Sequence, residues 1–251
     1  MLTAEVRKAN EITGKKVVVG NGHTVKWHEV WEHNPRMSRT YYPGAPWVNT
    51  IKGNRPYIDY TKTNKLKMAW KPWKVEPGEI YLTESEKTKD TGFVYIEPNI
   101  KGSFGGNKDW GFDNWQKVVD ALLHIRWIQG PGRRLRGVEQ RDTGSFRGAC
   151  GLLSGADFFV GTDGALHHAS AALGRPAVVV WGGLIGPEIL GYDTHINLRA
   201  KGVKDCGSIA PCLHCRSALQ QVSVDMVVKA VSSLVETLKG RQQDKEDRLV
   251  V

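Results

Sequence analysis

Two segments of the chain concentrate the residue types that bind phosphate. The first, residues 97–110, offers Asn99, Ser103 and Lys108 together with three glycines whose backbone N–H groups a ligand can approach closely. The second, residues 161–168, leads from an apolar run into helical spacing, so that free N–H groups at a helix start would face a ligand. A diphosphate held between a lysine and a helix N-terminus is the chemistry that this pair of segments favours.

Five residues of the second segment are candidate ligands for a phosphate and the group attached to it: Asp163, Gly164, Ala165, Leu166 and His168. For two of them a structural role is an open alternative. Asp163 has the residue type and place of a helix cap, and a histidine such as His168 can serve only to join two parts of the fold by hydrogen bonds.

The elements that must position these segments become regular after residue 91. Apolar runs alternate there with amphipathic stretches, which is typical of parallel strands covered by helices on both faces. Residues 91–240 are therefore predicted to form a doubly wound α/β domain of about five strands, with ligands at the carboxyl ends of the strands. The predicted strands are residues 93–96, 127–128, 158–160, 177–181 and 196–198.

The two ends of the chain differ from this central part. Residues 1–90 are broken by prolines and predict one clear strand at 16–20, a short helix at 25–32, and a polar linker at 83–90. At the other end, Ser223 is expected to cap a last helix and Gly240 to end it. Residues 241–251 are then expected to be a polar tail.

Composition narrows the class of protein. The 251 residues are 40% hydrophobic with a formal charge of +9, which excludes a disordered chain and favours anionic partners. No apolar run reaches the roughly 18–20 residues of a membrane-spanning helix, and the first residues lack the apolar core of a secretion signal. A cytoplasmic protein is expected. The dinucleotide fingerprint, the P-loop and the nucleophile elbow are all absent, which disfavours dehydrogenase, P-loop NTPase and acyl-hydrolase chemistry.

Residues 163–176, read with the Val-Val-Val-Trp-Gly-Gly of residues 178–183, resemble the C-terminal signature of the heptosyltransferase-like glycosyltransferases, family 9, which have the GT-B fold. Lys108-Asp-Trp110 resembles the Lys-x-Trp segment of the same family at a suitable distance upstream. The resemblance covers residues 92–240. It implies the donor-binding half of a GT-B enzyme, preceded by a reduced and irregular acceptor-side region at residues 1–90.

The family's activity implies inverting transfer of a sugar from a nucleotide-diphosphate sugar to an acceptor hydroxyl, with no cofactor or metal ion required. In this reading Lys108 contacts the diphosphate, Asp163 to Leu166 cradle the phosphates and the sugar, and His168 faces them. The catalytic base belongs in the N-terminal region, where His23, Glu29 and Asp59 are the candidates. An inverting transfer needs such a base within hydrogen-bond reach of the acceptor.

The cysteines form a separate group. Cys206, Cys212 and Cys215 precede the last helix, where many members of the family carry cysteines. With His214 they would make a structural zinc site, although their spacing is not that of a standard pair of zinc knuckles. Packed or exposed free thiols are therefore the favoured interpretation, with zinc as the alternative.

The acceptor and even the class of function stay open. The family favours a saccharide or lipid-core acceptor, whereas the basic charge and the interleaved lysines and aromatic residues of 57–74 favour a hydroxylated nucleic-acid base, as in DNA modification. A non-catalytic nucleotide- or nucleic-acid-binding protein and a zinc-bearing interaction module are the alternatives. The sequence does not set an oligomeric state.

Overall fold

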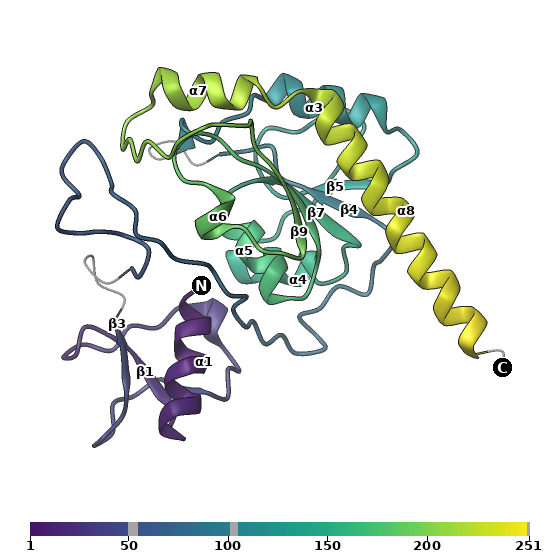
Figure 1. Cartoon of the computed structure of the whole chain (residues 1–251). Helices are drawn as coiled ribbons and strands as arrows, with labels where there is room; N and C mark the ends of the chain where they lie inside the picture. The colour runs from purple at the N-terminus through teal and green to yellow at the C-terminus, as the bar shows by residue number, and fades with distance from the viewer. Residues whose placement is uncertain (50–54, 101–104, 250–251) are drawn as a thin grey trace.

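The computed structural model describes residues 1–49, 55–100 and 105–249, so Ser103 lies outside the described residues. Within them the strands form two parallel sheets (Figure 1). The larger has the order β6-β5-β4-β7-β8-β9 and the smaller the order β2-β1-β3. The strands of the larger sheet are β4 (Val94–Ile96), β5 (Trp127–Gln129), β6 (Glu139–Gln140), β7 (Phe158–Thr162), β8 (Ala177–Val180) and β9 (His195–Leu198).

The larger sheet is covered on both faces, as its apolar runs predict. Along β8, Ala177 and Val179 belong to one hydrophobic core, and Val178 and Val180 to the other. This is the alternation of side chains across a strand. Helices α4 (Phe146–Leu153), α5 (Ala165–Ala172) and α6 (Pro187–Leu190) pack on the first face, and α3 (Phe112–Ala121) and α8 (Val224–Leu249) on the second. The predicted doubly wound α/β fold is confirmed.

The strand order creates a switch point in this sheet. The chain moves from β4 outward to β5 and β6, then returns to β7 on the other side of β4. Connections therefore leave β4 and β7 in opposite directions, which opens a crevice outside their carboxyl ends. Glu97 follows β4 and Asp163 follows β7, so both side chains belong to that edge.

Two elements differ from the prediction for this region. The sixth strand, β6, consists of two exposed polar residues and carries no apolar pattern that could reveal it. The last helix, α8, continues past Gly240 to Leu249 instead of ending there. Gly240 does not take the left-handed conformation of a helix stop, and most of the residues that follow it are strong helix formers.

The smaller sheet and one helix form the N-terminal unit. Its elements are α1 (Leu2–Thr13), β1 (Val17–Gly20), the single 3₁₀ turn η1 (Glu29–Trp31), β2 (Met37–Ser38) and β3 (Trp47–Asn49). The core consists of Val6, Val17, Val19 and Met37. The strand at 17–20 is confirmed, the helix expected over 25–32 is reduced to η1, and α1 was not predicted.

Residues 55–75, called the connecting segment below, join this unit to the larger sheet. The segment is fixed to the larger domain by backbone and side-chain bonds: Met68 N–H donates to Gly207 O (2.8 Å), and the Trp70 indole donates to Leu184 O (3.0 Å). Tyr57 is buried in the core of the larger domain. The connecting segment therefore lies against the loops that follow β8.

The stretch expected to be a polar linker, residues 83–90, is also attached. The guanidinium of the buried Arg147 donates to both carboxylate oxygens of Glu86 at 2.6 and 2.7 Å. These bonds, together with the backbone N–H of Thr83, lower the pKa of Glu86 to about 2. Among the helices of the described residues, none has the length and apolarity needed to cross a bilayer.

Candidate functional site

An ion pair spans the crevice at the switch point. Asp163 follows β7, Lys108 comes from the loop after β4, and the Lys108 ammonium contacts Asp163 Oδ2. The Asp163 side chain is 5% exposed and that of Lys108 is 26% exposed. An ammonium has three N–H donors, so Asp163 fixes Lys108 while leaving donors for a ligand.

Helix α5 begins beside this pair. Its N-cap is Gly164, which has no side chain to cap the first turn. The interpretation of Asp163 as a helix cap is therefore wrong, because its carboxylate pairs with Lys108 instead. The first N–H groups of a helix have no partner inside the helix. They add a partial positive charge next to the ammonium.

His167 fixes the turn at the start of α5. Its ring is fully buried, and Nε2 lies 3.1 Å from Leu190 O, so Nε2 carries the proton. Nδ1 then accepts the N–H of Gly164 at 3.3 Å. Burial lowers the pKa of His167, which is neutral. The structure assigns this residue to holding the turn.

His168 has one ring nitrogen bonded within the fold and the other near the ion pair. Its Nδ1 lies 2.8 Å from the Tyr192 hydroxyl, and its Nε2 faces Asp163 Oδ1 at 4.0 Å. Burial lowers the pKa of His168 well below its usual value, and the nearby Lys108 ammonium lowers it further. One nitrogen of a neutral ring is thus structural, and the other is directed at the crevice.

Sequence reasoning missed Tyr192 and His195, which complete this cluster. The two rings lie 5.1 Å apart, and His195 Nε2 is 3.4 Å from Ser170 Oγ. Burial lowers the pKa of His195 to about 3. Within the described residues, Nδ1 of His195 is a buried polar atom without a hydrogen-bond partner. Tyr192 follows His168 by 24 positions and His195 lies still further along the chain, so no local spacing could connect them with His168.

Glu97 places a second carboxyl group at the carboxyl end of β4. Oε1 accepts the backbone N–H of Asn99 at 2.7 Å, and burial raises the pKa of Glu97 to about 7. Asn99, predicted to bind a ligand, instead joins two loops: it accepts the N–H of Arg133 at 2.9 Å and donates to Arg133 O at 3.2 Å.

The hydrogen bonds of the three base candidates lead away from the ion pair. Glu29 Oε1 accepts the backbone N–H of Arg147 (3.1 Å), and Asp59 accepts the N–H and hydroxyl of Thr61 (3.1 and 2.6 Å). His23 lies exposed in the turn after β1, where its backbone N–H donates to Asn21.

An aromatic cavity of about 700 Å³ separates α1 and β3 from the connecting segment. Its wall includes Trp47, Tyr57 and Trp73. The charges of Asp163 and Lys108 both act on the Tyr57 hydroxyl, whose pKa is raised mainly by burial. Tyr57, in the wall of this aromatic cavity, is therefore within electrostatic range of the ion pair.

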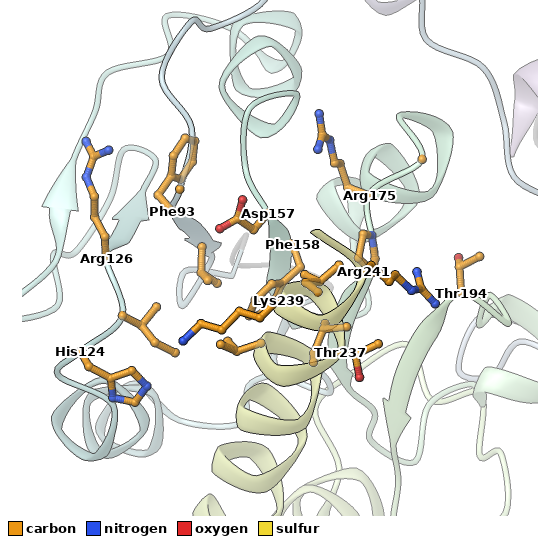
Figure 2. A pocket seen from close by; sticks show the side chains of 18 of the residues that line it. Phe93, His124, Arg126, Asp157, Phe158, Arg175, Thr194, Thr237, Lys239 and Arg241 are labelled. Carbon is orange, nitrogen blue, oxygen red and sulfur yellow. The ribbon is translucent and has the colours of Figure 1, made fainter. Parts of the chain in front are cut away.

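A larger cavity, of about 1050 Å³, lies at the opposite edge of the sheet. It is lined by residues that precede the strands, such as Asp157 and Arg175, and by the second half of α8. Figure 2 shows Lys239 extending into it from α8, with Asp157 nearby.

The cysteines predicted as a metal site are brought together, but the histidine is not. The sulfur atoms of Cys206, Cys212 and Cys215 all lie within 4.8 Å of one another. His214 Nε2 lies 2.7 Å from Lys204 O and is not a member of this group.

Comparison with solved structures identifies similar folds. Over 66% of its length the chain matches TibC, the iron-containing dodecameric glycosyltransferase of enterotoxigenic E. coli, with 16% identity, 52% coverage of TibC and a TM-score of 0.53. It also matches the E. coli heptosyltransferase WaaC (20% identity, 60% of this chain, 46% of WaaC, TM-score 0.46) and a family 9 glycosyl transferase of Veillonella parvula (14%, 64%, 54%, 0.49).

The match to TibC confirms, at the level of fold, the resemblance to heptosyltransferase-like glycosyltransferases of the GT-B fold over 66% of the chain. The chain spans about half the length of the solved structures that it matches. No protein-family model matches the sequence, and no curated protein matches it.

Proposed function

We propose that the crevice between β4 and β7 binds a nucleotide-diphosphate sugar and that the protein transfers its sugar to an acceptor hydroxyl. The observation that carries this proposal is the Lys108–Asp163 pair at the switch point, beside the start of α5. The similarity in fold to glycosyltransferases supports it. WaaC is described with ADP and TibC with ADP-D-β-D-heptose, so ADP-linked sugars are the first donors to test.

The charges fit the leaving group of such a transfer. The acceptor oxygen forms a bond to the anomeric carbon, and the bond from that carbon to the phosphate oxygen breaks, with its electron pair leaving on the nucleoside diphosphate. Lys108 offsets the new charge, and Asp163 keeps the ammonium in place before the donor arrives. His168 Nε2 and the N–H groups of α5 add neutral donors.

In this proposal the Lys108 ammonium supplies the positive charge that a divalent ion would otherwise bring to the diphosphate. Asp163, His167 and His168 are close enough to hold an ion, but the ammonium already contacts the carboxylate. We expect turnover to be unchanged when Mg²⁺ or Mn²⁺ is added. Activation by either ion would contradict this assignment.

The acceptor is proposed to bind in the aromatic cavity, because its wall includes Tyr57, whose hydroxyl is within electrostatic range of Lys108 and Asp163. Apolar rings with a few polar groups at the rim are typical of small-molecule sites.

His23 is the proposed base, since its turn follows the carboxyl end of β1 and its ring is exposed. It would take the proton that the acceptor hydroxyl loses. Inversion predicts a product of opposite anomeric configuration to the donor, which NMR of the product can test.

A nucleic-acid acceptor has weaker support from the connecting segment. Lys65, Lys67 and Lys71 are exposed there, but the Tyr57 ring is buried and the Trp70 indole bonds to Leu184 O. The cations thus face solvent while the rings face the protein. If DNA or RNA is the acceptor, binding should weaken steeply with salt, and charge reversal of the three lysines should flatten that slope. Negligible binding at about 50 mM salt would exclude this acceptor class.

The deciding experiment measures binding and turnover separately. Thermal stabilisation across ADP-, GDP- and UDP-linked sugars, followed by calorimetry with the best ligand, tests the donor site. Assays with saccharide and nucleic-acid acceptors then test transfer. Donor binding without any turnover would favour the non-catalytic alternative, and no binding at millimolar concentration would overturn the donor site itself.

A further inference from the structure

The three clustered cysteines have the spacing of ligands that share one ion. Cys206 Sγ lies 3.3 Å from Cys215 Sγ and 3.9 Å from Cys212 Sγ. A disulfide requires sulfur atoms about 2.05 Å apart. Two thiolates on a tetrahedral ion, each at about 2.3 Å from it, lie about 3.8 Å apart.

The backbone around the cysteines supports thiolates. Cys212 immediately precedes α7 (Leu213–Gln220), and its sulfur accepts the N–H of Cys215 at 3.5 Å. The N–H of Ser208 donates to Cys206 Sγ at 3.4 Å. Such N–H donors and a nearby helix N-terminus favour the deprotonated sulfur that a metal binds.

We propose that Cys206, Cys212 and Cys215 bind one thiophilic divalent ion, of the zinc or ferrous type, and that this ion fixes the loop carrying Lys108. Binding replaces three thiol protons, which are released to solvent, and leaves a centre of net charge −1. Among the described residues no other His, Cys, Asp or Glu completes the group, so water takes the remaining position.

Asn107 links the cysteines to the donor crevice. It is buried, its Nδ2 donates to Ser208 O and Ala210 O, both at 2.8 Å, and its Oδ1 accepts the N–H of Cys212 at 2.9 Å. All three bonds thus go to the segment that the ion would order. The next residue is Lys108, so loss of the ion should loosen the ammonium that contacts Asp163. This consequence rests on the proposed donor site, whereas metal binding does not.

The first experiment measures metal directly. The full chain, purified without chelator, is analysed for zinc and iron, then stripped and refilled with Co²⁺ to reveal the intense absorption of thiolate-bound cobalt. We expect about one ion per chain, lost in Cys212→Ser. Cys150→Ala is the control because Cys150 lies in α4 and is not a member of this group, so it should retain the ion.

Either metal supports the proposal, and the analysis identifies which one is bound. Less than about a tenth of an ion per chain after refilling overturns it, as does a Cys212→Ser variant that keeps its metal. A thiol titration of the unfolded chain that finds fewer than the four cysteines of the sequence would indicate a disulfide instead, and would also overturn it.

The second experiment tests the link through Asn107. Asn107→Ala should keep the ion but weaken binding of ADP or an ADP-sugar about tenfold, within the usual range of coupling between two sites. Unchanged nucleotide affinity in both Asn107→Ala and the metal-stripped wild type would overturn the link. If the wild type binds no nucleotide at all, the donor proposal fails, but the metal analysis still tests the cysteine site independently.

Discussion

The two edges of the six-stranded sheet differ in how their charges are arranged. At the carboxyl edge, Lys108 and Asp163 form a largely buried pair beside the start of α5, and the histidines around them are neutral. At the amino edge, a larger cavity is lined by Asp157, Lys239 and other charged residues over an apolar floor. By cavity size alone, the amino edge would be the candidate ligand site. Preorganised charge at a switch point selects the carboxyl edge, because strands of a parallel sheet present their loops and helix starts there.

Replacing Lys108 should give the largest effect. Lys108→Ala is expected to weaken donor binding or turnover by roughly 10–1000-fold, the range for one preorganised electrostatic contact. It also leaves the Asp163 carboxylate buried without its partner, which should cost roughly 3–5 kcal/mol of unfolding free energy. Calorimetry with the best nucleotide and denaturant unfolding measure the two effects.

A double variant separates these effects. Lys108→Ala with Asp163→Ala removes the unpaired charge, so stability should recover while donor binding stays weak. Lys117→Ala is a suitable control, because Lys117 is an exposed lysine of α3. If Lys108→Ala kept wild-type donor affinity and rate, the carboxyl edge would not be the donor site, and the contrast with the amino edge would be lost.

His168→Ala should have the next largest effect, a loss of donor affinity of about tenfold from one hydrogen-bond donor at the crevice. Because the pKa of His168 is well below its usual value, its ring is neutral at pH 7, and donor binding should show no titration of this histidine near pH 6.5. Tyr192→Phe keeps the ring packing but removes the hydroxyl that holds Nδ1, so a smaller loss is expected. If His168→Ala unfolds while Tyr192→Phe stays folded with full donor affinity, the His168 ring has only a structural role.

Glu97 gives a pH dependence of smaller size. Its pKa is raised from 4.5 to about 7 in the folded protein, so the folded state holds a proton that the unfolded chain has lost between these values. The contribution of Glu97 to stability should therefore fall as pH rises from 4.5 to 7, by up to about 3 kcal/mol, against the opposite contribution of the buried histidines, whose pKa values are lowered. Glu97→Gln should flatten this dependence and be the more stable protein at pH 8, as denaturant unfolding across pH would show. Identical pH profiles for the two proteins would contradict the buried position of this carboxyl group.

How much of the fold could be predicted from the sequence depends on how far apart in the chain the contacting residues lie. Strands such as β8, with its continuous apolar run, and helices such as α4, with its apolar residues at helical spacing, are encoded locally. The N-terminal unit is not, because β2 and β3 are two and three residues long. Helix α1 buries only Thr3, Ala4 and Val6, too few positions for a clear helical stripe.

The candidate site shows the same limit. Lys108, Asp163 and His168 were identifiable as residue types at strand ends. Their pairing was not, since the ammonium and the carboxylate are 55 positions apart in the chain and only the strand order brings them together. Asn99 illustrates the opposite error: a polar residue in a promising loop proved to bond to Arg133 of the next loop. Residue type predicted the chemistry, and tertiary contacts decided which residues are free to perform it.

The amino edge should show the smallest effect on the proposed reaction. Lys239→Ala combined with Arg241→Ala removes two cations from the larger cavity without touching the carboxyl edge, so nucleotide affinity should change less than about twofold, since solvent and salt screen charges across the sheet. Calorimetry at two salt concentrations would measure this beside Lys108→Ala. If the amino-edge variant lost tenfold or more while Lys108→Ala bound normally, the anion would occupy the larger cavity. The Lys108–Asp163 pair at the switch point would then serve only the stability of the fold.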